Sequence, residues 1–433
     1  MMKYFILTAT ILFSSITTNA QKTDKELVKI LKKSGKFKEI LDSDKYEVQI
    51  LYTQIDRDAQ NKPTFRTLSY NFDPNRYFYP ASTVKFPSVL LALEKLNSLK
   101  IKGLDKTTPM VIQKAFDGHE GVVGDSTSEN GKASIAHFAK KILLVSDNDA
   151  YNRLYEFIGQ QEFNDKLFSK GYRNTRILHR LSVPYSVEQN KITPAISFGE
   201  TGKKRNIPPY ADRVDRMEVS VPQAIYTQPL VINKTKNYIP QTSIKKGTGY
   251  MKGDKLINEP FDFTTKNFFP LDEQQEILKA VLFPEAVSAQ KRFNLTDEDY
   301  RFLYQYMSQL PSETTYPKYD PKEIWDSYCK FLMFGDNKNP MPKNIRIFNK
   351  VGDAYGFLLD NAYIVDFDKK IEFMVSAVIY CNSDGVFNDD KYDYDTIGFP
   401  FYANLGKVLY EYESKRKKKN LPDLSKFRVK YDK

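Results

Sequence analysis

The segment that decides the fold is YPASTVKFPSVLLALEKL, residues 79–96, in which a short turn runs into an apolar helix pattern. Its apolar side chains recur at the spacing of a buried helix, namely Phe86, Val89, Leu90, Leu93 and Leu96. Ser82 lies at the predicted start of this helix, where serine is a favoured N-cap. Lys85 follows three residues later, so its amine is expected over the same helical face as the Ser82 hydroxyl.

Ser82 and Lys85 together have the properties of an activated nucleophile. The amino end of a helix carries free backbone N–H groups and the positive end of the helix dipole. A lysine that is desolvated within such a helix shifts toward its neutral form, and the neutral amine can accept a proton. We therefore expect Ser82 to attack a substrate with Lys85 as the adjacent base.

Composition and charge exclude several classes of protein. The 433 residues are 41% hydrophobic, which is enough for a sizeable core in one large domain or two to three ordinary ones. The net charge is +11, but the basic residues are scattered and no nucleic-acid-binding motif is present, so no nucleic-acid partner is expected. A basic protein of this kind suits the anionic polymers and lipids of a bacterial envelope.

Residues 1–20 predict an export signal. Lys3 precedes an apolar stretch that is too short to span a bilayer, and Thr18-Asn19-Ala20 before Gln21 is typical of a cleavage site. No cysteine follows this site and no later segment reads as transmembrane, so neither a lipid anchor nor stable membrane insertion is expected. We expect a soluble mature protein in the periplasm or outside the cell.

Histidines and cysteines give no sign of a metal site. The three histidines, His119, His137 and His179, form no ligand-like pair, so we expect no metal and no other cofactor. The two cysteines, Cys329 and Cys381, are compatible with one disulfide in an oxidising compartment and equally with two buried free thiols.

Hydrophobic periodicity predicts the elements of the first half of the chain. An amphipathic helix is expected over residues 24–41, followed by a hairpin of two strands at 47–56 and 64–73. Amphipathic helices at 133–144 and 150–158 are separated by Ser146-Asp147-Asn148, which taken alone would be a helix cap.

The second half changes character twice. Residues 200–275 contain short strand-like pieces, after which helical periodicity returns at residues 271–283, 296–310 and 321–334. The last quarter predicts a β-meander over 344–382 and a terminal helix over 399–416. The basic run at the end of that helix suits solvent and the helix carboxyl end better than a binding patch.

The bare Ser-x-x-Lys pattern is weak evidence because it recurs at Ser243 with Lys246, Ser288 with Lys291, Ser327 with Lys330 and Ser414 with Lys417. Only Ser82 combines the pattern with a turn, a helix start and an apolar continuation. Only Ser82 is followed by Ser146-Asp147-Asn148 and by Lys350-Val351-Gly352 on a late strand. A Ser-His-Asp triad lacks the supporting G-x-S-x-G motif.

Together these segments resemble the serine β-lactamase and penicillin-binding-protein superfamily, and within it the class A β-lactamases. The matching pieces are YPASTVKFPSVLLALEKL, LLVSDNDAYNRLYEFIG and NKVGDAYGFLLDNAYIVDF, in the order of the family. The resemblance implies an α/β (α+β) β-lactamase/transpeptidase-like fold, in which terminal helices flank an antiparallel sheet beside an all-helical part. The site would lie between these two parts.

The resemblance also implies how one catalytic domain, residues 21–433, is divided. Residues 21–75 and 341–433 would form the α/β part, and residues 76–196 the helical part. Residues 197–340 would be an elaborated, inserted region before the Lys-x-Gly strand. We expect part of this insertion, within residues 226–269, to border the mouth of the site and to narrow the choice of substrate.

The family's roles transfer to matching positions. Ser82 would attack the carbonyl of a β-lactam, Lys85 would take or relay its proton, and Ser146 would pass a proton to the departing ring nitrogen. Lys350 would supply positive charge for Ser146 and for the substrate carboxylate. The remaining predicted substrate-binding residues are Asn148, Val351, Gly352 and Asp353, with the oxyanion between the backbone N–H groups of Ser82 and Asp353.

Two departures from the family pattern affect the expected chemistry. Val351 stands where the family has a hydroxyl residue, so one hydrogen bond to a substrate carboxylate is missing. The family's omega-loop motif Glu-x-x-Leu-Asn, which activates the deacylating water, corresponds to RLSVPYSVEQN, where Glu188 and Asn190 are only two apart. Glu188 is the candidate base, and the alternative is an exposed loop carboxylate.

The predicted function is that of a secreted serine hydrolase that opens β-lactam rings through an acyl-enzyme on Ser82, with slow deacylation. One alternative is a peptidoglycan D,D-peptidase or another acyl hydrolase on the same fold. Another is a penicillin- or muropeptide-binding protein that is acylated and does not turn over. The expected partner in each case is a small β-lactam or a peptidoglycan stem peptide.

Overall fold

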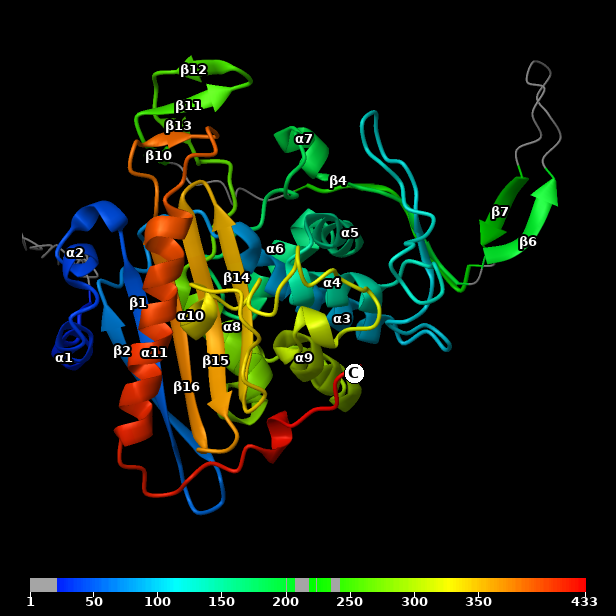
Figure 1. Cartoon of the computed structure of the whole chain (residues 1–433). Helices are drawn as coiled ribbons and strands as arrows, with labels where there is room; N and C mark the ends of the chain where they lie inside the picture. Colours follow the sequence, from blue (N-terminus) through cyan, green and yellow to red (C-terminus); the bar gives the residue numbers. More distant parts are fainter. Residues whose placement is uncertain (1–21, 200, 207–217, 223, 235–241) are drawn as a thin grey trace, which may run out of the picture.

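The computed structural model describes residues 22–199, 201–206, 218–222, 224–234 and 242–433 (Figure 1). The predicted export signal lies outside these residues. Within the described part, no helix has both the length and the apolar character needed to cross a membrane.

A five-stranded antiparallel sheet joins the two ends of the chain. Its order is β14-β15-β16-β1-β2. The strands are β1 (Gln49–Arg57), β2 (Pro63–Tyr70), β14 (Ile345–Ala354), β15 (Phe357–Asp366) and β16 (Ile371–Tyr380). β1 pairs with β16 in a register that places Leu51 opposite Ser376. The predicted hairpin and the predicted meander are therefore confirmed, and they are parts of one sheet.

The terminal helices cover one face of this sheet (Figure 1). They are α1 (Lys25–Lys33), α2 (Lys38–Leu41) and α11 (Phe399–Lys415). The prediction of one continuous helix over residues 24–41 was wrong, because the chain turns at Gly35, whose φ of 70° is a conformation that favours glycine. The tyrosine hydroxyl of Tyr52 on β1 donates to Glu413 of α11, which ties this helical layer to the sheet.

The opposite face of the sheet packs against the helical part. Its helices are α3 (Lys85–Leu99), α4 (Ile135–Val145), α5 (Asn148–Ile158), α6 (Gln160–Ser169), α8 (Leu271–Leu282) and α9 (Asp297–Ser308). α3 is buried on nearly all sides. The predicted helices at 133–144, 150–158, 271–283 and 296–310 are confirmed within a few residues.

Part of the predicted insertion belongs to the core. The side chain of Gln275 on α8 accepts a hydrogen bond from Thr53 of β1 and donates one to Ser376 of β16. α9 contacts β14. Residues 271–308 therefore complete the hydrophobic layer of the sheet, and the surface elaboration is confined to the segments before and after them.

The rest of the described chain forms short elements, some inside the insertion and some outside it. They are β3 (Met110–Ile112), α7 (Val187–Asn190), β4 (Ile192–Thr193), β5 (Ile196–Phe198), β6 (Thr201–Asn206), β7 (Glu218–Pro222), β8 (Tyr226–Gln228), β9 (Val231–Ile232), β10 (Lys245–Lys246), β11 (Gly249–Lys252), β12 (Lys255–Ile257), β13 (Phe261–Asp262), α10 (Phe331–Phe334) and β17 (Val386–Phe387). β6 and β7 pair as a hairpin that projects from the body of the molecule (Figure 1). β11 pairs with β17 in parallel.

The predicted helix over residues 321–334 is wrong. Only α10 is assigned as helix there, and Leu332 and Met333 inside it have non-helical dihedral angles. The amine of Lys330 is buried and donates to the carbonyl oxygens of Met307 and Ile347. The backbone N–H of Leu332 donates to the carboxylate of Asp360 at 3.0 Å instead of to a helical carbonyl.

The two cysteines are not joined. Cys329 and Cys381 are both buried free thiols. Of the two alternatives that the sequence left open, the structure has the one without a disulfide.

Candidate active site

Ser82 lies in a tight turn between the sheet and α3. The turn is a 3₁₀ helix, Ala81–Val84, which continues directly into α3. The prediction that Ser82 caps α3 is wrong, because the residue before α3 is Val84 and no side chain caps its amino end. Thr83 satisfies the turn instead by donating to the carbonyl of Pro80 at 2.7 Å. The Ser82 hydroxyl is therefore left for other partners.

The residue before the nucleophile has an unusual backbone. Ala81 has a φ of 46°, in the left-handed region that alanine rarely adopts, and it is buried. Such strain persists only where the surrounding structure holds it, and it is common at functional sites.

Lys85 is the centre of the polar contacts. Its Nζ lies 2.7 Å from Ser82 Oγ and 2.6 Å from Asn148 Oδ1, and it also donates to the carbonyl oxygen of Ser146. The Lys85 residue is 0% exposed. Burial lowers the pKa of this amine well below its usual range, and the neighbouring Lys350 lowers it further.

The hydrogen-bond partners of Lys85 determine where its lone pair points. A neutral amine has two N–H donors and one lone pair. The backbone carbonyl of Ser146 and the amide oxygen of Asn148 can only accept, so they take both donors. The lone pair is then left for the hydroxyl proton of Ser82. This is the arrangement that a general base requires.

Ser146 connects the two lysines. It ends α4 with a φ of 62°, and the next residue, Asp147, caps α5 by accepting from Ala150, so the predicted polar break is confirmed. Ser146 Oγ lies 2.7 Å from Lys350 Nζ and 3.2 Å from Lys85 Nζ. The hydroxyl can therefore pass a proton between the two amines and a group bound in front of it.

Lys350 points toward Ser146 and away from the open space of the site. It is 3% exposed, and it also donates to the carbonyl of Val351 at 2.9 Å. Burial lowers the pKa of Lys350 to about 8. The structure thus brings Lys350 to Ser146, whereas its predicted contact with a substrate carboxylate stays a prediction.

Gly352 packs directly against the nucleophile turn. A Cβ at this position would lie 2.9 Å from both the amide nitrogen of Ser82 and the carbonyl oxygen of Pro80. Because β14 is at the edge of the sheet, its free side faces this turn. The predicted oxyanion position between the N–H groups of Ser82 and Asp353 depends on this close approach.

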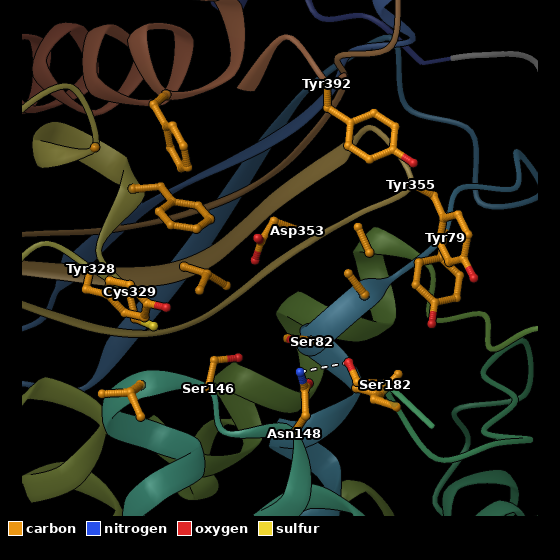
Figure 2. A pocket seen from close by; sticks show the side chains of 18 of the residues that line it. Tyr79, Ser82, Ser146, Asn148, Ser182, Tyr328, Cys329, Asp353, Tyr355 and Tyr392 are labelled. Carbon is orange, nitrogen blue, oxygen red and sulfur yellow. Dashed lines mark hydrogen bonds between the residues drawn. The ribbon is translucent and has the colours of Figure 1, made fainter. Parts of the chain in front are cut away.

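The site opens into a cavity of about 1220 Å³. Figure 2 shows Ser82, Ser146 and Asn148 on one side of it and Asp353 opposite, with Tyr79, Tyr355 and Tyr392 farther along. Val351 also lines the cavity. As expected, the segment 226–269 borders the cavity, through Lys266, and residues 325–338 form a further wall that includes Trp325, Tyr328 and Cys329.

Asp353 is exposed in the cavity, and its carboxylate has no hydrogen bond or ion pair within the described residues. Although the side chain is open to this space, the dense walls around it raise the pKa of its carboxyl, while the charges of Lys85 and Lys350 act in the opposite direction.

The structure does not bring Glu188 to the site. Glu188 lies on the short helix α7, its side chain is 78% exposed, and its carboxylate pairs with Lys191 at 2.9 Å. It is absent from the residues that line the cavity. This position matches the alternative reading of Glu188 as an exposed loop carboxylate.

Ser182 is a residue of the site that the sequence did not predict. Its Oγ accepts from Asn148 Nδ2 at 2.9 Å, and it lines the cavity (Figure 2). The loop is held there by Arg180, whose Nε donates to the buried Glu156 at 2.8 Å. Nothing in the local sequence pattern indicated Ser182, because its position depends on this contact with a distant helix.

Part of the chain matches a known protein family. Residues 32–206 match the beta-lactamase enzyme family. Solved structures that are similar to the chain include a beta-lactamase from Sphaerobacter thermophilus (12% identity, TM-score 0.44, covering 87% of this chain and 95% of that chain). Another is a class A beta-lactamase from Clostridium kluyveri (14% identity, TM-score 0.45, covering 88% and 98%). No curated protein matches the chain in sequence.

The family match over residues 32–206 and the arrangement of helices around an antiparallel sheet support a β-lactamase-like fold. Among the described residues, no group of three or more histidine, cysteine, aspartate and glutamate side chains is placed to hold a metal ion.

Proposed function

We propose that the protein is a serine hydrolase of the class A β-lactamase type that forms an acyl-enzyme on Ser82. The observation that carries this proposal is the desolvated amine of Lys85, whose two donors are taken by Ser146 and Asn148 while its lone pair faces Ser82. The amino-terminal sequence supports export of the protein before it acts.

Acylation uses the groups around Ser82 in turn. Ser82 Oγ bonds to the lactam carbonyl carbon as its proton moves to Lys85 Nζ. The carbonyl oxygen takes the negative charge between the two backbone N–H groups. The carbon–nitrogen bond of the ring then breaks, and the nitrogen takes the proton of Ser146. Ser146 recovers a proton from Lys85, whose amine is 3.2 Å away, so Lys85 returns to its neutral form.

Deacylation lacks an equivalent base. A water must be activated beside the ester carbonyl, and the loop residue that is hydrogen-bonded to Asn148 is Ser182, whose hydroxyl is neutral. Glu188 pairs with Lys191 at the surface. We therefore propose that acylation is fast relative to hydrolysis of the acyl-enzyme.

The proposal is tested by the mass of the intact protein after incubation with benzylpenicillin. Wild-type protein should gain one penicillin on the peptide that contains Ser82, and Ser82→Ala should abolish the adduct. Ser327→Ala is the matched control, because Ser327 lines the same cavity in a Ser-x-x-Lys pattern, but its lysine is bound elsewhere. An adduct on Ser327 would show that the nucleophile is misassigned.

The kinetics should show a burst of product equal to the enzyme concentration, followed by a slow steady state. We expect Glu188→Gln to leave the slow phase unchanged, whereas Ser182→Glu should raise it by about tenfold or more by placing a carboxylate near the ester. Stopped-flow measurement with a chromogenic cephalosporin separates the phases. Rapid turnover without a burst would contradict the proposed slow deacylation.

The missing deacylation base also favours a second candidate, a penicillin- or muropeptide-binding protein that is acylated and does not turn over. A D,D-peptidase on the same site would release D-alanine from a stem peptide. Assaying this release alongside cephalosporin turnover distinguishes the three functions.

A further inference from the structure

If Ser82 is acylated as proposed, the side chains beside it decide which substrates the site accepts. Asp353 and Val351 are two residues apart on β14, so they share one face of the strand, and both line the cavity. The intervening Gly352 packs on the Ser82 turn. These two side chains are therefore next to the reacting carbonyl.

Their position is on the side of the leaving group. Ser146 must reach the departing nitrogen, and Ser146 is hydrogen-bonded to Lys350, which immediately precedes Val351 on β14. A substituent on the carbon attached to that nitrogen would then lie near the part of β14 that carries Val351 and Asp353. In a penicillin this substituent is a carboxylate.

The part of β14 that such a substituent meets offers a carboxylate no exposed positive charge. Lys85 and Lys350 are 0% and 3% exposed, and neither lines the cavity. Val351 offers no hydrogen-bond donor from its side chain. Asp353 is the charged group of β14 that is exposed in the cavity.

The other charged groups of the cavity wall include both signs. Arg180 pairs with Glu156, and Asp336 pairs with Lys407. Lys338 and Lys266 keep their positive charge and lie 4.0 Å and 5.7 Å from the ring centroids of Trp325 and Phe261. Two further acids that line the cavity, Asp390 and Asp395, have no hydrogen bond or ion pair from their side chains in the part of the chain that is described.

We propose that Asp353, with Val351 beside it, makes the site select acyl donors whose leaving group carries a cation and disfavour those that carry a carboxylate. Asp353 is a specificity-determining residue in this proposal and takes no part in proton transfer. An attraction between opposite charges within a half-open cavity changes the rate of acylation by about 10- to 100-fold, through the encounter and the transition state.

Three derivatives of one penicillin test this selectivity. Benzylpenicillin carries the carboxylate, an alkyl ester of it is neutral, and its 2-(diethylamino)ethyl ester is cationic at pH 7. The rate of acylation of Ser82, measured from the mass of the protein against time, should rise from the first to the third. The ratio of cationic to anionic rates should be about tenfold or more, and it should shrink as salt is added.

Asp353→Asn, which keeps the shape of the side chain, should lower that ratio by about tenfold. Asp390→Asn makes the same change of charge on another wall and should alter the ratio by less than about twofold. Val351→Thr is an independent variant that should accelerate acylation by benzylpenicillin itself. An order of rates that favours the carboxylate, or a ratio that Asp353→Asn leaves unchanged, would overturn the proposal.

The two proposals fail in different ways. If none of the three derivatives labels wild-type protein at Ser82, the proposed function is wrong, and so is the selectivity that rests on it. If they label Ser82 without the predicted order, only the role of Asp353 is wrong.

Discussion

Replacing Lys85 by methionine is expected to slow acylation of Ser82 by about 100- to 10,000-fold. Methionine keeps much of the apolar stem but removes the amine that faces the serine hydroxyl. The carbonyl of Ser146 and the amide oxygen of Asn148 lose a donor, which costs at most about 1–3 kcal/mol of folding stability for each, because both residues face the open cavity. Acylation is followed by mass and stability by thermal unfolding.

Lys330→Met is the control for this experiment. Lys330 is also a buried lysine with three polar partners, Met307, Ile347 and Asn349, but it does not contact Ser82. Its replacement should lower stability to a similar degree while acylation stays of the same order. Equal losses of acylation in both variants would show that Lys85 acts through stability alone.

The pH profile gives a second readout of the same residue. Lys85 must be neutral to act as base, so acylation should rise with pH through its lowered pKa. Lys350 must be protonated to support Ser146, so acylation should fall again above its pKa of about 8. The rising limb should disappear in Lys85→Met, and its survival would point to another base.

Gly352→Ala is expected to reduce acylation by about 100-fold or more. The new Cβ would lie 2.9 Å from the amide nitrogen of Ser82 and from the carbonyl oxygen of Pro80. Because both are backbone atoms, they cannot rotate away as a side chain would, so β14 must move away from the turn. The N–H groups that face the oxyanion then lose their alignment. The measurement is the acylation rate with one penicillin under single-turnover conditions.

Gly356→Ala is the matched control for this substitution. Gly356 lies in the turn of the same hairpin at a φ of 74°, and a Cβ there would lie 2.6 Å from the Cβ of Asn382. It should lower stability without displacing Gly352 from Ser82. A loss of acylation as large as that of Gly352→Ala would contradict the assignment of the effect to the oxyanion position.

The predicted positions that the structure brings together share a physical origin. Ser82 and Lys85 meet because they are three residues apart where a turn enters a helix, and Ser146 and Asn148 follow from a polar break between two helices. Lys350 lies on a strand that its β-branched and aromatic residues predicted. Local patterns therefore placed each side chain on its element, whereas the resemblance to a known family implied that the elements meet.

The loop of Glu188 could not be predicted in this way. Its short helix α7 is set by a capping box between Ser186 and Gln189, and the loop before it is held by the buried pair of Arg180 and Glu156. These contacts turn Glu188 outward and Ser182 inward. The spacing of apolar residues therefore predicts neither the outward position of Glu188 nor the inward position of Ser182.

The segment 321–334 illustrates the opposite error, in which periodicity was followed too far. Its aromatic and apolar residues recur at helical spacing, but Lys330 within it is held by backbone carbonyls of α9 and β14. Tertiary hydrogen bonds replaced the helix that local preference favoured.

The sheet that joins both ends of the chain determines when the protein can fold during synthesis. β1 is made early, yet one of its neighbours is β16, and Tyr52 on β1 is bonded to a residue 361 positions later. Until residues 345–380 have emerged from the ribosome, only the β1–β2 hairpin of this sheet can form, and an isolated hairpin is marginally stable in water. Such distant pairing slows folding. The five-stranded sheet can therefore be completed only after most of the chain has been synthesised.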